Sequence, residues 1–174
     1  MHGLNVPTRL IAEAADVAEG TIFRVFPDKN ALLKAALAYI FDPGPTVLML
    51  RDVPATWPLA ARLRAAAQVV GHRVAANAPV IAALRTPEGL ALLNGRPFDG
   101  HPLTALQVII EAVADLVRSD EHRLRCSADT TAQLLISMLM LISRGVPGPD
   151  LSVEDLADLL LNGLINRPTG EDPC

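Results

Sequence analysis

An all-α protein is predicted by three features of the sequence. Alanine and leucine dominate a composition that is 51% hydrophobic but only 3% aromatic, a balance that favours helices over a β-sandwich or barrel. Glycine and proline gather in short clusters, and between these clusters the apolar residues recur with helical spacing. The 174 residues are enough to bury a core, either in one domain or in a small module followed by a larger one.

Two clusters of turn-forming residues divide the chain. Asp42-Pro43-Gly44-Pro45 closes a first segment, and residues 145–149 (GVPGP) separate the last two helical patterns. We therefore expect a small module at residues 1–42 and a larger helical domain at residues 46–174.

Three short helical patterns make up the small module. Apolar residues at positions 10, 11, 14 and 15 predict the first helix, positions 22, 23 and 26 the second, and residues 31–41 a longer third. Asp16 falls where the chain must reverse, and aspartate tolerates the positive φ that such a position often needs. Val17 is then expected to tuck between the helices, with Ile22 and Phe26 in the core. The layout is that of a helix-turn-helix.

Longer helices are expected in the larger domain, at about residues 58–77, 102–118, 127–143 and 152–166. Prolines suit the first turn of the first two helices. Ser127 can cap the third, and Ser152 with Asp155 resembles a capping box for the last. Residues 87–102 show no clear pattern, and we interpret GLALLNG at 89–95 as a helix-and-turn connection.

The last two helices predict a homodimer interface. The helix at 127–143 is apolar nearly all round, so we expect it to be buried on two sides. The helix at 152–166 has an apolar face wider than one core contact requires. The alternative is that both helices form the centre of a monomeric bundle.

Charge and motif content argue against several classes of function. The net charge is −4, so any contact with nucleic acid must come from a local patch. Cys126 and Cys174 form no CxxC pair and the histidines show no metal-ligand spacing, so we expect neither a disulfide framework nor a metal. No catalytic or nucleotide-binding motif is evident, and Asp120-Glu121-His122 is interpreted as a solvated helix end. We therefore expect no enzyme activity and no cofactor.

The hydropathy pattern predicts a cytoplasmic protein without a membrane partner. The most apolar run, residues 134–142, has nine residues and is too short to span a bilayer as a helix. The N-terminus lacks a basic region followed by a signal-like apolar core.

The most informative pattern lies at residues 7–29. Residues 11–29 read IAxxAxVxxGTxFRxFPxK, and residues 6–29 as a whole resemble the DNA-binding signature of the tetracycline-repressor-like (TetR-type) regulators. The resemblance implies an all-helical dimer, with a helix-turn-helix DNA-binding module followed by a helical ligand-binding and dimerisation domain. It also implies a repressor that a small-molecule effector releases from double-stranded operator DNA.

The resemblance makes Ala18 to Phe26 the recognition helix, with its N-terminal residues nearest the base edges of the major groove. The positions matching the family's DNA contacts are Thr8, Ala18, Glu19, Gly20, Thr21, Phe23, Arg24 and Lys29. Thr21 offers a hydroxyl, Arg24 a guanidinium suited to guanine or phosphate, and Lys29 a charge for phosphate at a helix N-terminus. Gly20 allows the backbone to approach closely.

The effector is expected to be small and mostly apolar, with helices at about residues 58–77, 78–93 and 102–118 forming the walls of its pocket. The scattered polar candidates for this site are Gln68, His72, Arg73 and Gln107. They do not specify a ligand chemistry.

The module departs from the family pattern in three ways. Residues 1–41 hold four basic and four acidic side chains, so the module is neutral where a DNA binder is normally basic. Phe23 stands where the family usually has tyrosine, and Val25 where a polar or aromatic residue is common. Only Met1 and His2 precede Gly3, so most of the family's first helix is absent, and we expect this chain to bind DNA poorly. The alternative function is therefore a dimeric small-molecule-binding protein of the same fold that has lost DNA binding.

Overall fold

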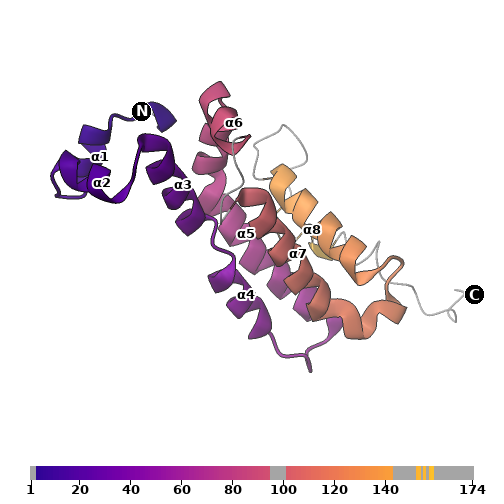
Figure 1. The fold of residues 1–174 in the computed structure, drawn as a ribbon. Coiled ribbons are helices and arrows are strands. Elements are labelled where there is room, and N and C mark those ends of the chain that lie inside the picture. The colour runs from indigo at the N-terminus through magenta and orange to yellow at the C-terminus, as the bar shows by residue number, and fades with distance from the viewer. Residues whose placement is uncertain (1–2, 95–100, 143–151, 154, 156, 159–174) are drawn as a thin grey trace, which may run out of the picture. The chain divides into compact units, whose positions relative to one another are not determined.

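The computed structural model describes residues 3–94, 101–142, 152, 153, 155, 157 and 158. These residues form helices and no strand, so the predicted all-α class is confirmed (Figure 1). The helices are η1 (Gly3–Asn5), α1 (Thr8–Ala14), α2 (Glu19–Val25), α3 (Lys29–Ile40), α4 (Gly44–Arg51), α5 (Leu59–Leu84), α6 (Pro87–Leu93), α7 (Pro102–Val117), η2 (Arg118–Arg123) and α8 (Ala128–Ile142). No helix in this part of the chain is both long and apolar enough to cross a membrane.

The chain divides into two compact units. The first comprises Met1–Asp42 and Asn77–Ala105, and the second Pro43–Ala76 and Leu106–Cys174. Helices α5 and α7 each contribute residues to both units. The assignment of DNA binding to residues 1–42, and of ligand binding and dimerisation to residues 46–174, stays a prediction.

An apolar cluster holds the first unit together. Its buried members are Leu37, Phe41, Leu84, Leu92 and Ala105. A β-carbon on Gly89 would lie 2.5 Å from the Cα of Leu84, so the close packing of α6 on the end of α5 requires glycine there. The cluster thus joins α3 to three segments that follow much later in the sequence.

A larger apolar cluster holds the second unit together. It is formed mainly by the N-terminal part of α5, by α7 from Leu106 onward and by α8, which lie side by side (Figure 1). Leu63, Val70, Val113 and Ile136 are among its buried side chains. The helices predicted to begin at Pro102 and Ser127 are therefore present and supply this core.

Both predicted helix caps in the second unit are present. The Ser127 hydroxyl accepts a hydrogen bond from the Thr130 amide at 3.1 Å. The Ser152 amide donates to the Asp155 carboxylate and the Asp155 amide donates to the Ser152 hydroxyl, each at 3.0 Å. This reciprocal pair is the capping box predicted at residue 152. The rest of the predicted last helix, including residues 159–166, lies outside the described residues.

Helix boundaries differ from the sequence prediction at three prolines. The cluster at residues 42–45 was predicted to be a turn, but α4 begins within it, because Pro45 lies in a first turn where a missing N–H costs little. In the segment without a clear pattern, Pro87 opens α6, and the Thr86 hydroxyl caps it by accepting from the Gly89 amide at 3.2 Å.

Helix α5 was predicted to end at about Asn77 but continues to Leu84, with Pro79 inside it. Proline removes one hydrogen bond from a helix interior. The residues beyond Pro79 compensate because Val80 and Ile81 pack against the cluster of the first unit, in which Leu84 is buried. Tertiary packing therefore extends a helix that the local sequence interrupts.

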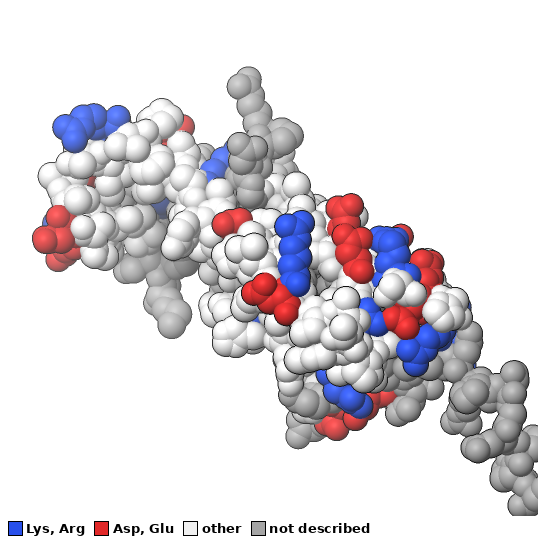
Figure 2. Space-filling model, turned by 90° about the horizontal axis from the view of Figure 1, so that it is seen from below, with Lys and Arg blue, Asp and Glu red and all other residues white. Residues whose placement is uncertain are grey.

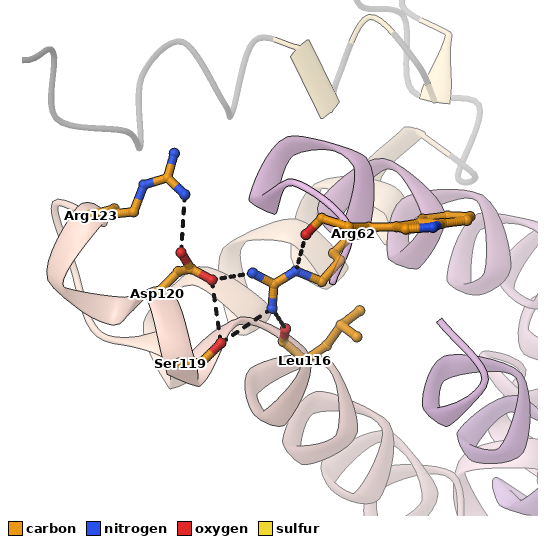
Figure 3. A network of polar contacts seen from close by, with 6 residues as sticks. Arg62, Leu116, Ser119, Asp120 and Arg123 are labelled. Carbon is orange, nitrogen blue, oxygen red and sulfur yellow. Dashed lines mark hydrogen bonds and ion pairs between the residues drawn. The ribbon is translucent and has the colours of Figure 1, made fainter. Parts of the chain in front are cut away.

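Among the described residues of the second unit, Arg62 is the charged side chain that is buried, with only 3% of its surface exposed. Its Nε donates to the Trp57 carbonyl at 3.1 Å, and its Nη1 donates to the Leu116 carbonyl at 2.6 Å. Its Nη2 pairs with the Asp120 carboxylate (Figure 3). One guanidinium thus connects the start of α5 to the end of α7 and to η2.

Asp120 is bound from two sides. Besides Arg62, it accepts from Arg123 Nη1 at 3.0 Å and from the Ser119 hydroxyl at 3.3 Å (Figure 3). The hydrogen bond from Arg123, and then the bond and charge of Arg62, hold the pKa of Asp120 below its ordinary value. The sequence predicted a solvated helix end at residues 120–122. This prediction is wrong for Asp120, which is half-buried and paired with Arg62, but it holds for the exposed Glu121 and His122.

Replacing Asp120 by asparagine is expected to destabilise the protein by roughly 2 kcal/mol at neutral pH, because the buried guanidinium loses its charged partner. In the unmodified protein, the contribution of Asp120 is complete above the ordinary carboxyl pKa of about 4 and is lost as the pH falls through the lowered pKa. The free energy of unfolding of D120N should therefore decrease less steeply than that of the unmodified protein as the pH falls. Urea unfolding from about pH 3 to pH 7 measures both effects.

The matched control is Asp115→Asn, which removes an exposed carboxylate that pairs with Arg118 at 3.2 Å. An exposed pair of this kind contributes little, so the unfolding midpoint should hardly move. Equal midpoints and equal pH profiles for D120N and the unmodified protein would contradict the role given to this network.

Candidate nucleic-acid interface

The reversal between α1 and α2 is built on Asp16, which has φ of 54°. The Val17 amide donates to the Ala12 carbonyl at 3.0 Å, and the Asp16 amide donates to the Glu13 carbonyl at 3.2 Å. This pair of bonds is a Schellman motif, which satisfies the last carbonyls of α1 with a left-handed residue just after the helix. The predicted positive φ at Asp16 is confirmed.

The core of the two short helices is small. Ala12 is 2% exposed and Ile22 is 8% exposed, as expected for Ile22, while Phe26 is half-buried. Val17 was predicted to tuck between the helices, which is wrong, since 42% of its surface is exposed. Its backbone amide closes α1, and the buried side chains of the two helices are Ala12 and Ile22 instead.

A side-chain hydrogen bond links the two helices at their N-terminal residues. The Thr8 hydroxyl, at the start of α1, donates to Glu19 Oε1 at 2.5 Å, at the start of α2. Both residues are half-buried. Two residues predicted to contact DNA are therefore engaged with each other in the free protein, which the sequence did not reveal because they lie eleven positions apart.

The exposed residues of the recognition helix are mostly small or apolar. Ala18, Gly20, Phe23, Arg24 and Val25 are exposed, with exposed fractions of 46% for Phe23 and 66% for Val25. Thr21 is half-buried. The charged group that α2 exposes is thus Arg24, and the apolar surface around it is unusual for a solvent-facing helix.

Lys29 is the first residue of α3 and is half-buried. Asp28 precedes it and caps the helix by accepting from the Ala31 amide at 2.8 Å. The acidic cap and the basic side chain are therefore neighbours at the same helix end. The negative charge next to it in the sequence limits the positive potential that Lys29 contributes.

The balance of charge predicted for the module is visible on its surface. Figure 2 shows both basic and acidic side chains on the surface of the N-terminal module, at the left of the view, with uncharged surface between them. The four basic and four acidic side chains of residues 1–41 leave it without net charge. An interface here would depend more on shape and short-range contacts than on long-range attraction.

The four polar candidates for the ligand site lie in different surroundings. Gln68 and His72 are exposed on α5 and Gln107 is exposed on α7, whereas Arg73 is half-buried. Arg73 Nη1 donates to the Thr46 hydroxyl at 3.1 Å, and Thr46 is only 1% exposed. Sequence reasoning missed Thr46, whose signal is one hydroxyl within the otherwise apolar run TVLML of α4.

Comparisons with known proteins relate the N-terminal module, and the fold of the chain, to bacterial regulatory proteins. Residues 2–36 match the family model of bacterial regulatory proteins of the tetR family. Among solved structures, the chain is similar to the TetR transcriptional regulator SCO0520 from Streptomyces coelicolor, with 27% identity and a TM-score of 0.59, covering 97% of this chain and 91% of that one. No curated protein sequence matches the chain.

Replacing Thr8 by valine is expected to loosen α2 by roughly 1–2 kcal/mol, because the Glu19 carboxylate loses its donor while the shape of the side chain is kept. Native-state hydrogen exchange at the Ile22 and Phe26 amides should become faster. The conservative variant Thr8→Ser retains the hydroxyl and should restore slow exchange. Unchanged exchange rates in Thr8→Val would show that the hydrogen bond does not hold the two helices together.

Proposed function

Since the chain belongs, by its N-terminal module and its fold, to the tetR family of bacterial regulatory proteins, we propose that it is a homodimeric transcriptional repressor. It binds double-stranded operator DNA through α1, α2 and the start of α3. A small-molecule effector bound by the helical domain releases it. The observation that supports DNA binding most directly is the exposed α2, which follows a tight left-handed turn and carries Arg24 outward.

The residues of the module divide by the kind of DNA contact that they suit. Lys29 acts on phosphate without sequence preference, because an ammonium group is a point charge with no base-specific geometry. Arg24 suits a guanine edge, where its guanidinium can donate two hydrogen bonds. Thr21 donates to phosphate or to a base, and Thr8 acts largely through the position that it gives Glu19.

Effector control requires two states of the repressor with different affinities for the ligand. We propose that the effector is small and mostly apolar, because the core of the second unit, against which it would bind, consists mainly of aliphatic side chains. The enclosed Arg73–Thr46 pair is the best supported polar contact among the predicted candidates, since Gln68, His72 and Gln107 face solvent in the single chain.

The proposed dimer uses α8. One face of this helix lies in the core of its own unit, with Leu135, Ile136 and Leu139 buried. The other face leaves apolar surface uncovered, since Leu134 is 39% and Leu141 is 53% exposed. A helix that is apolar on both faces is stabilised when a second copy covers the outer one.

The test of DNA binding begins with selection of an operator from random duplexes by the full chain at low salt, because weak binding is expected from a module with so little net positive charge. Lys29→Ala should then weaken binding to all sequences and reduce the slope of log affinity against log salt by about one. Arg24→Ala should relax the preference at one base pair, with a loss of discrimination of about tenfold. Fluorescence anisotropy across a salt series measures both.

The same titrations decide between the two functions. If no duplex is enriched, because the unmodified chain binds DNA without preference or does not bind it, the repressor function is excluded. The result would then favour a dimeric small-molecule-binding protein of the same fold. An unchanged salt slope for Lys29→Ala would show that Lys29 does not contact phosphate, but it would not contradict the proposed repressor function.

Leu141→Arg is expected to dissociate the dimer, because each protomer would bring a charge into an apolar contact. Light scattering or analytical ultracentrifugation should report a monomer that keeps the helical circular dichroism of the unmodified protein. Leu103→Arg is the matched control, since Leu103 is 70% exposed on α7 and outside the proposed interface. A monomeric unmodified protein, or a dimeric L141R variant, would overturn this interface.

A further inference from the structure

We propose that Gly20 leaves room against α2 for the C5-methyl group of an operator thymine, which makes Gly20 a specificity-determining residue. The inference rests on the proposed DNA binding and goes further by naming the base feature that is read. It begins from a glycine in the middle of a helix, where glycine is a poor choice for stability.

The fold of the free protein does not require this glycine. Gly20 lies inside α2, and a β-carbon built on it meets no heavy atom of the described residues within 4 Å. It is not among the residues that need a left-handed backbone, unlike Asp16 in the preceding turn. Alanine at this position would stabilise the helix, since glycine is the weaker helix former. The open space at Gly20 therefore serves something that docks from outside.

Gly89 provides the contrast within the same unit. There a β-carbon would lie 2.5 Å from the Leu84 backbone, so glycine is explained by internal packing. No such contact explains Gly20. The two glycines differ in that one accommodates the protein's own backbone and the other leaves space on an exposed surface.

The surroundings of Gly20 favour an apolar partner. Ala18, the residue that precedes α2, and Phe23 within α2 are exposed nearby, and the Glu19 carboxylate accepts a hydrogen bond from the Thr8 hydroxyl. Residues 18–20 therefore offer no free side-chain group for hydrogen bonding to a base edge, and the polar groups proposed to read DNA lie further along the helix, at Thr21 and Arg24. In the major groove, the thymine methyl is the apolar feature that distinguishes one base pair from the others.

The experiment removes one methyl group from the DNA and, separately, adds one methyl group to the protein. The selected operator is prepared with each thymine replaced in turn, in both half-sites, by deoxyuridine, which lacks only the C5-methyl. At one position the unmodified protein should lose about fourfold in affinity per half-site, as expected for one methyl group. Gly20→Ala should lose at least about tenfold on the thymine operator, because its added methyl and that of the base compete for one space.

The decisive result is the coupling between the two changes. At the same position, Gly20→Ala should bind the uracil operator more tightly than the thymine operator, which reverses the preference of the unmodified protein. Thermal unfolding should show G20A to be at least as stable as the unmodified protein, which separates this effect from misfolding.

The outcomes distinguish the inference from the proposed function. If an operator is selected and bound but no thymine shows the reversal, the role of Gly20 is overturned and DNA binding stands. If G20A binds the thymine operator as tightly as the unmodified protein, the inference also fails. If no duplex is preferred by the unmodified protein, both the proposed function and this inference fall.

Discussion

The reversal of the chain at Asp16 is the constraint on which the N-terminal module depends. Helices α1 and α2 have seven residues each and are too short to be stable alone. The left-handed Asp16 lets the Val17 and Asp16 amides satisfy the end of α1, and the Thr8–Glu19 hydrogen bond then joins the two helix starts. Only Ala12 and Ile22 are buried in the two helices, so these local hydrogen bonds, more than apolar packing, hold α1 and α2 together.

The second unit has a large core and long helices, so its stability depends less on local hydrogen bonds than that of the N-terminal module. Apolar packing of alanine, leucine and valine is tolerant of small shifts between helices, and a directional contact is needed to select one arrangement. Arg62 supplies that contact, because its donors require acceptors from Trp57, Leu116 and Asp120 at the same time. A guanidinium left without these partners would be a costly buried charge, so misaligned arrangements of α5 and η2 are disfavoured.

Local chemistry in this sequence was easier to predict than contacts between distant residues. The positive φ of Asp16, the Ser127 cap and the Ser152–Asp155 capping box follow from residues within a few positions of each other. The Thr8–Glu19 bond and the burial of Arg62 do not, because they depend on where helices meet. Arginine is usually exposed, so nothing in the composition marks Arg62 as a core residue.

The prolines and the candidate site show the same limit. The helix from residue 58 was predicted to end at about residue 77 and the first segment to close at residues 42–45, yet packing extends α5 past Pro79 and α4 begins within the cluster. Arg24, Thr21 and Lys29 could be proposed from the family pattern, but the exposure of Val17 and the open space at Gly20 required the structure.

The equal numbers of acidic and basic side chains in residues 1–41 affect how a DNA-binding protein of this kind would find its site in a genome. Attraction to random DNA comes mainly from lysine and arginine that replace counterions on phosphates, and it permits one-dimensional sliding between distant sites. A neutral module weakens that attraction, so the search would proceed mostly by diffusion through solution and repeated short encounters. A DNA-binding protein of this kind would then be less sequestered by non-specific DNA, and a larger share of its copies would be free in solution.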